Sequence, residues 1–294
     1  MPNSVRGEIY QTVSLTSGLY LVATPIGTAR DITLRALDIL ASADAIAAED
    51  TRVARRLLEL HAIPLGSRPL LAYHDHNGAS QRPKLLAILE AGKSLAYVSD
   101  AGTPLVADPG FALVREVAEA GHKVTAAPGP SALLAALSLA GLPTDKFLFA
   151  GFAPSAKGAR RRFLEELAQT KTTVVLFESA KRVHSTLDDL CDIFGEDCPV
   201  AICRELTKKF EEVMRGKMAE LIEKCRDRVL KGEIVLVIGQ PIEQEVSAET
   251  LERALDAALQ TQSVKEAAAQ IASQFEKPRR QIYQLALAMK DRNE

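Results

Sequence analysis

The chain has 294 residues, of which 47% are hydrophobic and 25% are charged, and its formal net charge at pH 7 is −2. This length and composition predict a globular protein of about two domains. The balanced charge argues against a protein that coats nucleic acid nonspecifically, and no apolar stretch is long enough to span a bilayer.

Residues 1–17 form a polar tail without a signal-peptide pattern, so we expect a cytoplasmic protein with no membrane partner. Residues 18–130 then alternate short apolar runs with amphipathic helical patterns, which predicts βαβ units around a mostly parallel sheet. The expected strands of this N-terminal α/β domain are residues 19–23, 45–48, 70–73, 95–98 and 123–127. Asp31 is the expected N-cap of the helical pattern that follows the first strand.

Each of these expected strands ends in a polar or glycine-rich cluster. In chain order the clusters read TPIG, ED, HDHN, SDAGTP and PGPS. Ligands of such sheets bind outside the carboxyl ends of the strands. The pattern therefore gathers the unusual residues at one edge of the first sheet.

Residues 131–240 predict a second α/β domain. It begins with a helical run, Ala132–Ala140, that stops at Gly141, and its expected strands are residues 147–152, 173–177, 200–203 and 234–238. Residues 241–294 are alanine-rich and predict a small helical appendix, with a helix-turn-helix-like break at Lys277-Pro278. The expected fold class is α/β, with two α/β domains and this appendix.

Several common cofactor signatures are absent from the sequence. The first strand ends in TPIG rather than in G-x-G-x-x-G, and no Walker-type phosphate loop occurs. The four cysteines include no C-x-x-C pair, and residues 74–77 lack further ligands at useful spacing, so we expect no metal site. We favour a polar, substrate-facing loop at residues 74–77, with a solvated loop as the alternative.

Residues 98–110 carry the densest signal, with two glycines, two prolines and two aspartates between a strand and a helix. Glycine lets a backbone approach a ligand closely, and proline stiffens a loop. We therefore favour a ligand-binding loop. The alternative is a tight connection in which Asp108 caps the next helix.

Seven strings occur in order along the chain: GLYLVATPIG, AEDTR, VSDAGTPLVADPG, PGPSAL, FESAKRV, RELTKKFEE and KGEIVLVIG. Together they resemble the ribosomal RNA small-subunit methyltransferase I family of the tetrapyrrole methylase superfamily, over roughly residues 18–240. The resemblance implies a two-domain class III methyltransferase with S-adenosylmethionine in the cleft between the domains. It also implies that the substrate is a cytidine 2′-oxygen in the decoding region of 16S rRNA, that the partner is the small ribosomal subunit, and that the protein is a homodimer.

Motif by motif, the resemblance implies these cofactor contacts: Pro25, Asp100, Ala101, Gly102, Thr103, Val106, Ser131, Ala132 and Leu206. The chain reads Gly102-Thr103-Pro104 where the tetrapyrrole branch has G-D-P, which fits the RNA branch. It also has Thr28 where the family often has asparagine.

A ribose hydroxyl is a poor nucleophile at neutral pH, so a general base is expected. We favour Asp50 for this role and leave Glu49, His74 and His76 open. The alternative is structural, with Asp50 or Thr51 as the N-cap of the next helix.

Local basic clusters predict phosphate contacts if they lie near the cleft, although each alone is most often a solvated face. The expected RNA-contacting residues are Arg52, Lys157, Arg160, Arg161, Lys208, Arg279 and Arg280. Phe152 could stack on a base, but a buried aromatic is the favoured interpretation. The competing functions are methylation of a small tetrapyrrole and a non-catalytic RNA-binding assembly factor. For the appendix the alternative is a packing or dimerisation element.

Overall fold

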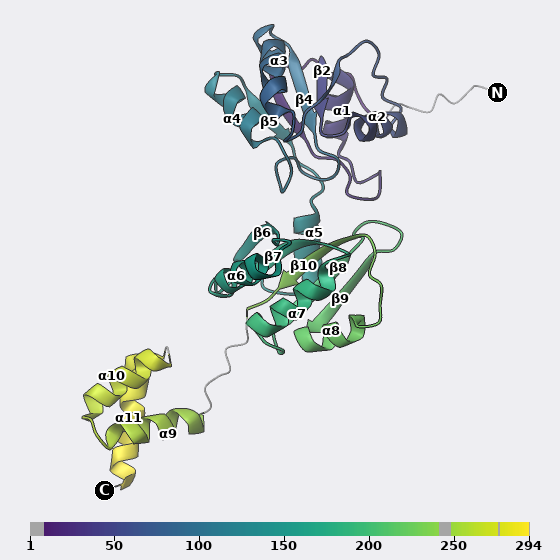
Figure 1. The fold of residues 1–294 in the computed structure, drawn as a ribbon. Helices are drawn as coiled ribbons and strands as arrows, with labels where there is room; N and C mark the ends of the chain where they lie inside the picture. Colours follow the sequence, from purple (N-terminus) through teal and green to yellow (C-terminus); the bar gives the residue numbers. More distant parts are fainter. Residues whose placement is uncertain (1–8, 241–247, 276, 294) are drawn as a thin grey trace, which may run out of the picture. The chain divides into compact units, whose positions relative to one another are not determined.

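The structure, a computed structural model, describes residues 9–240, 248–275 and 277–293 (Figure 1). The chain divides into two compact units, Met1–Pro241 and Ile242–Glu294. The first unit contains two five-stranded sheets, and the second contains helices alone in its described part.

The first sheet is entirely parallel, which confirms the expectation for the first half of the chain. Its strands are β1 (Gly18–Val22), β2 (Ala45–Ala48), β3 (Leu70–Ala72), β4 (Ser94–Val98) and β5 (Val124–Ala127), in the order β3-β2-β4-β1-β5. Because all five strands run in the same direction, their carboxyl ends lie at one edge of the sheet. The polar and glycine-rich clusters that follow the strands therefore lie at that edge.

Helices cover both faces of this sheet. Helices α1 (Leu34–Ser42) and α2 (Thr51–Leu60) pack on one face, and α3 (Gly78–Glu90) and α4 (Phe111–Glu119) pack on the other. Side chains of β4 alternate between these two cores, with Leu95 and Tyr97 on the α3/α4 side and Ala96 and Val98 on the α1/α2 side. Burial on both faces explains why the strands read as continuous apolar runs.

The described part of the predicted N-terminal tail packs against α1 and α2. Tyr10 is buried in the α1/α2 core, and its hydroxyl donates to the carbonyl of Ala62 at 3.2 Å. The backbone N–H of Gln11 donates to Asp38 at 2.6 Å. Residues 9–17 are therefore part of the first α/β layer rather than a free extension.

The second sheet is mixed. Its strands are β6 (Phe147–Phe152), β7 (Thr173–Ser179), β8 (Pro199–Arg204), β9 (Glu212–Lys217) and β10 (Glu233–Ile238), in the order β6-β7-β10-β8-β9. Only β6 and β7 are parallel, and the other neighbours are antiparallel. The sequence did not predict β9, because this edge strand reads EVMRGK and only Met214 of it is buried.

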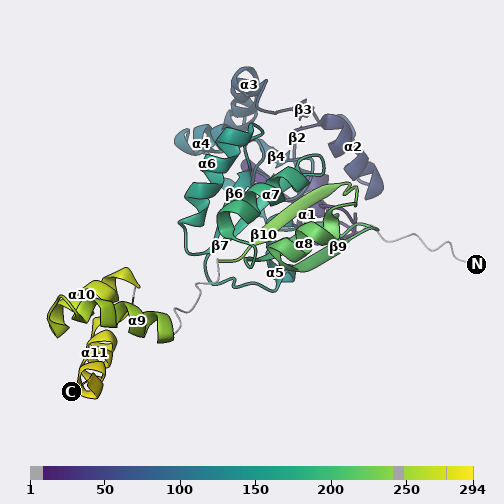
Figure 2. The ribbon, with the colours of Figure 1, turned by 60° about the horizontal axis from the view of Figure 1, so that its bottom comes forward.

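Helix α5 (Ala132–Ala140) packs on one face of the second sheet. Helices α6 (Lys157–Ala168), α7 (Val183–Phe194) and α8 (Met218–Cys225) pack on the other face, where Figure 2 shows α7 and α8 lying over the strands. Helix α5 ends where the sequence predicts, because Gly141 adopts a left-handed conformation with φ of 70°.

The second unit has a small core of its own. Helices α9 (Ala248–Leu259), α10 (Val264–Gln274) and α11 (Arg279–Asn293) bury Leu255, Ile271 and Ile282 against one another. Ser263 and Glu266 form a capping box at the start of α10. The expected helical appendix is thus a folded three-helix unit.

One expected helix cap is wrong, and the alternative cap at Asp108 does not form either. Thr33 rather than Asp31 caps α1, because its side chain accepts from the backbone N–H of Ala36. Gly110 rather than Asp108 precedes α4, and no side chain caps that helix. Within the described residues, no helix is long and apolar enough to cross a membrane.

Candidate active site

The loop between β4 and α4 is held in place on both sides. The backbones of Thr24 and Gly102 exchange two hydrogen bonds of 2.8 and 3.0 Å, which joins the loop to the end of β1. The hydroxyl of Thr103 donates to the carbonyl of Pro130 at 2.9 Å, which joins it to the segment after β5. The densest sequence motif therefore lies between two other strand-end clusters.

This loop also has an unusual backbone. Leu105 and Ala107 have φ values of 73° and 62°, a region that side chains with a Cβ rarely adopt. Such strain persists only where surrounding structure enforces it, and it concentrates at functional sites. At Gly110, with φ of 133°, a Cβ would lie 2.9 Å from the Tyr97 ring, so this turn requires glycine.

A second loop, residues 205–211, closes on the first sheet's strand-end loops. The backbone N–H of Thr28 donates to the Thr207 hydroxyl at 3.2 Å, and the Thr28 hydroxyl donates to the Thr207 carbonyl. A Cβ at Gly27 would lie 2.5 Å from the same hydroxyl. Threonine at position 28, the departure from the family pattern, thus takes part in the contact between the two halves of the first unit.

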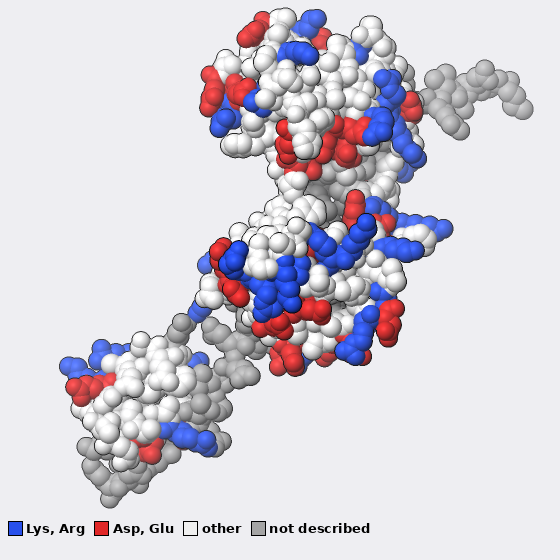
Figure 3. Space-filling view, viewed as in Figure 1, with Lys and Arg blue, Asp and Glu red and all other residues white. Residues whose placement is uncertain are grey.

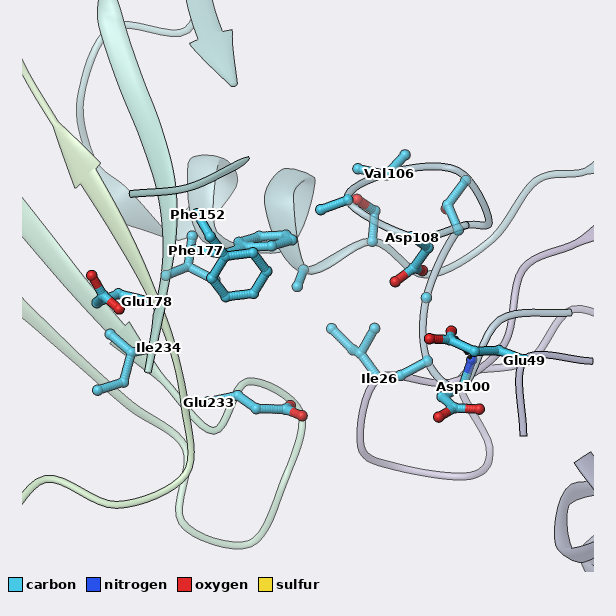
Figure 4. Close-up of a pocket in the computed structure, with 17 residues that line it drawn as sticks. Ile26, Glu49, Asp100, Val106, Asp108, Phe152, Phe177, Glu178, Glu233 and Ile234 are labelled. Carbon is cyan, nitrogen blue, oxygen red and sulfur yellow. Dashed lines mark hydrogen bonds between the residues drawn. The ribbon is translucent and has the colours of Figure 1, made fainter. Parts of the chain in front are cut away.

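A cavity of about 270 Å³ lies between these loops and the second sheet (Figure 4). Ile26, Glu49, residues 100–103 and 106–108 line it from the first sheet's side. Phe152, Phe177, Glu178 and residues 233–235 line it from the second sheet, and Ser131 and Ala132 line it at the start of α5. Its size is near the lower end of the range for small-molecule sites.

The cavity lining is acidic. Glu49, Asp100 and Asp108 supply carboxylates on the first sheet's side, and none of the lining residues is a lysine, arginine or histidine. The other two lining carboxylates, Glu178 and Glu233, form ion pairs with Arg182 and Lys208. Figure 3 shows acidic side chains gathered on the edge of the first-sheet half that faces the second sheet. Such a lining attracts a cationic ligand and repels a phosphate backbone.

The pKa values of two neighbouring carboxyl groups at the end of β2 shift in opposite directions. Burial raises the pKa of Glu49, and the nearby Asp100 and Asp108 raise it further. Asp50 instead caps α2 through the backbone N–H of Arg52 at 2.8 Å and accepts the Arg52 guanidinium as well. These hydrogen bonds lower the pKa of Asp50 to about 2.

Asp50 is therefore the N-cap of α2, as the structural alternative predicted, and it does not line the cavity. Its pKa of about 2 makes it a weak base, whereas Glu49, whose pKa is raised, lines the cavity. His76 is exposed in the loop after β3, with its ring 6.0 Å from that of His74, and does not line the cavity. No group of three or more metal-ligating side chains comes together within the described residues.

Most of the expected cofactor contacts meet in the cavity. Seven of the nine line it: Asp100, Ala101, Gly102, Thr103, Val106, Ser131 and Ala132. Pro25 instead lines a smaller groove of about 150 Å³ beside α2. Leu206 is 6% exposed and packs in the core between α5 and the second sheet, so it supports the site from behind.

The lining fits S-adenosylmethionine on chemical grounds. The carboxylates suit its sulfonium and ammonium groups, and Ile26, Val106 and Val235 offer apolar contact to its uncharged parts. The Gly102 turn has φ of 81° and brings the backbone to the cavity wall without a side chain.

The expected RNA-contacting residues are not equivalent. Arg52 is exposed with 90% of its side chain accessible, and Lys157 is exposed at the start of α6. Arg161 is half-buried and pairs with Asp189 and Asp192. Lys208 pairs with Glu205 and Glu233, while Arg279 and Arg280 are exposed at the start of α11.

Arg160 does not suit the role that the sequence predicts. It is 5% exposed, and its guanidinium contacts Asp189 at 2.7 Å beneath α6 and α7. An arginine at that depth is a core ion pair and cannot reach a phosphate without unpacking the helices. On the face that Figure 3 shows, Lys and Arg side chains gather on the part of the second-sheet half nearer the first-sheet half, and most acidic side chains lie beyond them.

Several cavity residues were not assigned from the sequence. Asp108, Glu178 and Glu233 line the cavity, and all three lie within motifs that carry the family resemblance. Membership of these motifs could have identified them from the sequence. Glu233 was missed because it begins β10, an antiparallel strand, whereas the strand-end argument applies to carboxyl ends. Phe152, expected to be buried, is 55% exposed and lines the cavity.

Comparisons with known proteins agree with the geometry. The family model for tetrapyrrole (corrin/porphyrin) methylases matches residues 18–222, and the model described as RsmI C-terminal HTH domain matches residues 244–290. A solved structure of the cobalamin biosynthetic enzyme cobalt precorrin-4 methyltransferase has a TM-score of 0.57 and 19% identity, covering 79% of this chain and 95% of its own. That likeness shows the fold.

Two curated relatives are similar along almost their whole length, and both are named ribosomal RNA small subunit methyltransferase I. The protein from Mesorhizobium japonicum is 43% identical over 94% of this chain and 94% of its own. The protein from Halalkalibacterium halodurans is 42% identical over 95% of this chain and 97% of its own. The chain therefore belongs to the tetrapyrrole methylases and, among them, to the ribosomal RNA small subunit methyltransferase I family.

Proposed function

We propose that this protein transfers a methyl group from S-adenosylmethionine to the 2′-oxygen of a cytidine ribose in the decoding region of 16S rRNA. The observation that carries the proposal is the acidic cavity with Glu49 at its wall, in a chain whose full-length relatives are named as rRNA methyltransferases. The cavity suits a cationic methyl donor and a single uncharged acceptor group.

S-adenosylmethionine, when bound, supplies a methyl group that its sulfonium already activates. The protein then has to hold donor and acceptor in line and exclude water. The turn at Gly102 and Thr103 and the first residues of α5, Ser131 and Ala132, would hold the donor. The lining carboxylates would bind its positive charges.

Glu49 would accept the proton of the ribose hydroxyl. Its raised pKa makes it a better base than Asp50 next to it, and it lies at the cavity wall. Burial also raises the pKa of Asp108, which makes Asp108 the alternative base on the same wall.

RNA phosphates would stay outside the acidic cavity and meet basic side chains around it. The candidates that remain accessible are Arg52, Lys157, Arg161, Lys208, Arg279 and Arg280. Arg160 is not among them. We propose that the helical unit helps to bind RNA, that the partner is the small ribosomal subunit in the cytoplasm, and that the protein acts as a homodimer, which sedimentation would test.

The experiment is transfer of tritiated methyl groups from S-adenosylmethionine to small ribosomal subunits that lack this modification, followed by nuclease mapping. Label on one cytidine ribose supports both the reaction and the substrate. Label on a small tetrapyrrole instead of RNA identifies a small-molecule methylase. Cofactor binding without any transfer identifies a non-catalytic factor, and either of these outcomes refutes the proposal.

A further inference from the structure

Phe152 is an aromatic ring exposed in the cavity. Its side chain belongs to the last residue of β6, is 55% exposed, and lines the cavity opposite the acidic wall (Figure 4). Burying a phenylalanine side chain is favourable relative to leaving it exposed to water. An exposed ring inside a ligand cavity is therefore a candidate contact for a ligand with an apolar face.

A β-bulge aims this ring into the cavity. Phe149 of β6 pairs with Val175, but the next pair is Phe152 with Phe177, so one extra residue is inserted. Gly151 has φ of 67° and provides the bend. Without the bulge, alternation would put Phe152 on the side of Leu148 and Ala150, which pack in the α6/α7 core.

The bulge instead brings three rings together on the cavity side. The ring centroids of Phe149 and Phe177 are 4.8 Å apart, and those of Phe152 and Phe177 are 5.6 Å apart, both in edge-to-face geometry. Phe149 and Phe177 are partly buried against α5. Phe177 packs against Phe152, Phe149 packs against Phe177, and Phe152 remains 55% exposed.

Arg182 holds the backbone on both sides of this cluster. Its guanidinium donates to the carbonyl of Ala153, the residue after Phe152, at 2.9 Å. It also pairs at 2.7 Å with Glu178, the residue after Phe177. Glu178 is itself buried and accepts the hydroxyl of Thr186 at 2.7 Å. The ring is therefore held in place before any ligand arrives, which lowers the entropy cost of binding.

We propose that Phe152 is the platform on which the base of the acceptor nucleotide stacks. The inference rests on the proposed function and adds the means by which one nucleotide is held. Proteins that recognise unpaired RNA stack its splayed-out bases on aromatic side chains, and enzymes that act on a base turn it out of its stack into a pocket. A base has an uncharged π-face, so it can enter an acidic cavity from which phosphates are repelled.

The arrangement of the two walls supports this assignment. Figure 4 shows Phe152 and Phe177 on one wall, and Glu49, Asp100 and Asp108 on the other. The residues that suit the methyl donor, at 101–103, 106 and 131–132, come from the first sheet's loops and the start of α5. A base on Phe152 directs its ribose toward the wall that carries Glu49. The competing occupant of the ring is the adenine of the cofactor.

The sequence offers a clean probe, because the chain contains no tryptophan. F152W places the only indole of the protein in the cavity, where base stacking would quench its emission. The matched control is F147W, at the opposite end of β6, where Phe147 is 41% exposed and does not line the cavity. The titrants are S-adenosylhomocysteine, a cytidine-containing oligonucleotide and unmodified small subunits.

We expect the oligonucleotide and the subunits to quench F152W but not F147W. We also expect F152A to lower the methylation efficiency with limiting subunits by roughly tenfold to a hundredfold, the usual effect of losing one base-aromatic stack. F152A should retain the wild-type affinity for S-adenosylhomocysteine, which also establishes that it is folded. F147A should methylate as the wild type does.

Two results would overturn the assignment. Quenching of F152W by S-adenosylhomocysteine alone, with loss of affinity for that ligand in F152A, would assign the ring to the cofactor. Wild-type kinetics in F152A would show that no base depends on it. If the wild type methylates no RNA but the oligonucleotide still quenches F152W, the proposed function fails and the stacking site stands.

Discussion

Glu49 and Asp50 are adjacent carboxylates, and the structure predicts that only one of them serves the reaction. Glu49→Gln keeps the size and polarity of the side chain but cannot accept a proton at neutral pH. A positioned general base contributes about 10²–10⁴ in rate. We therefore expect the single-turnover rate of methyl transfer to subunits to fall by that factor, or about 3–5 kcal/mol in the activation barrier.

Asp50→Asn is the matched control. Asparagine caps helices about as well as aspartate, so α2 should keep its start. The lost ion pair with Arg52 is solvent-exposed and should matter little to the fold. Because Asp50 does not line the cavity and has a pKa of about 2, the rate should stay close to that of the wild type.

The pH dependence provides an independent readout of the same assignment. Glu49 must be deprotonated to act, and its pKa is raised above 4.5 by burial. The wild-type and Asp50→Asn rates should therefore rise with pH through that raised pKa and then level off, whereas the Glu49→Gln rate should lack this rise. Near-wild-type turnover in Glu49→Gln would refute the assignment, and Asp108→Asn would then be the next variant to measure.

Three further predictions concern stability and binding. Because the folded-state pKa of Glu49 is raised, its charged form costs stability above that pKa and none below the unfolded value near 4.5, so Glu49→Gln should raise the Tm at pH 7 and not at pH 4. Arg160→Met leaves Asp189 buried with only Arg161 as a partner, so urea unfolding should show a loss of about 3 kcal/mol, whereas the exposed Arg162→Met should change stability by less than about 0.5 kcal/mol. Removing residues 242–294 should weaken subunit binding in filter assays while leaving S-adenosylhomocysteine affinity unchanged, since the cavity lies wholly in the first unit.

The outcomes that contradict these three predictions are equally direct. Equal Tm differences between wild type and Glu49→Gln at both pH values would mean that Glu49 is not desolvated. An Arg160→Met variant of normal stability but weak subunit binding would restore Arg160 as an RNA contact. If removal of the helical unit leaves the affinity for subunits unchanged, the unit does not bind RNA, and its role is packing or dimerisation.

Local sequence carried most of the information about the elements. Among the described residues, nine of the ten strands follow from short apolar runs, because buried strands exclude most polar residues. The strand β9 did not, because an edge strand with one buried side chain lacks that pattern. The cap of α1 was misassigned because Asp31 and Thr33 are both good cap residues, and only the fold decides which one meets a free N–H.

Part of the candidate site could also be predicted from the sequence alone. Parallel strands with polar ends were enough to predict that residues 100–103 lie together with other strand-end residues, because strand direction alone determines which ends meet. The ordered motifs were enough to predict the family. These properties depend on order along the chain and on local pattern, both of which are present in the sequence.

Only the tertiary structure decided which side chains do what within that site. Burial and neighbouring charges separate Glu49 from Asp50, and burial removes Arg160 from the surface. A single inserted residue in β6 turns Phe152 from the core into the cavity. The low pKa of Asp50 has a local cause, because Arg52 two residues along the chain donates to it. The desolvation of Glu49 and the burial of Arg160 arise from atoms that are distant in the chain, so no local pattern could contain them.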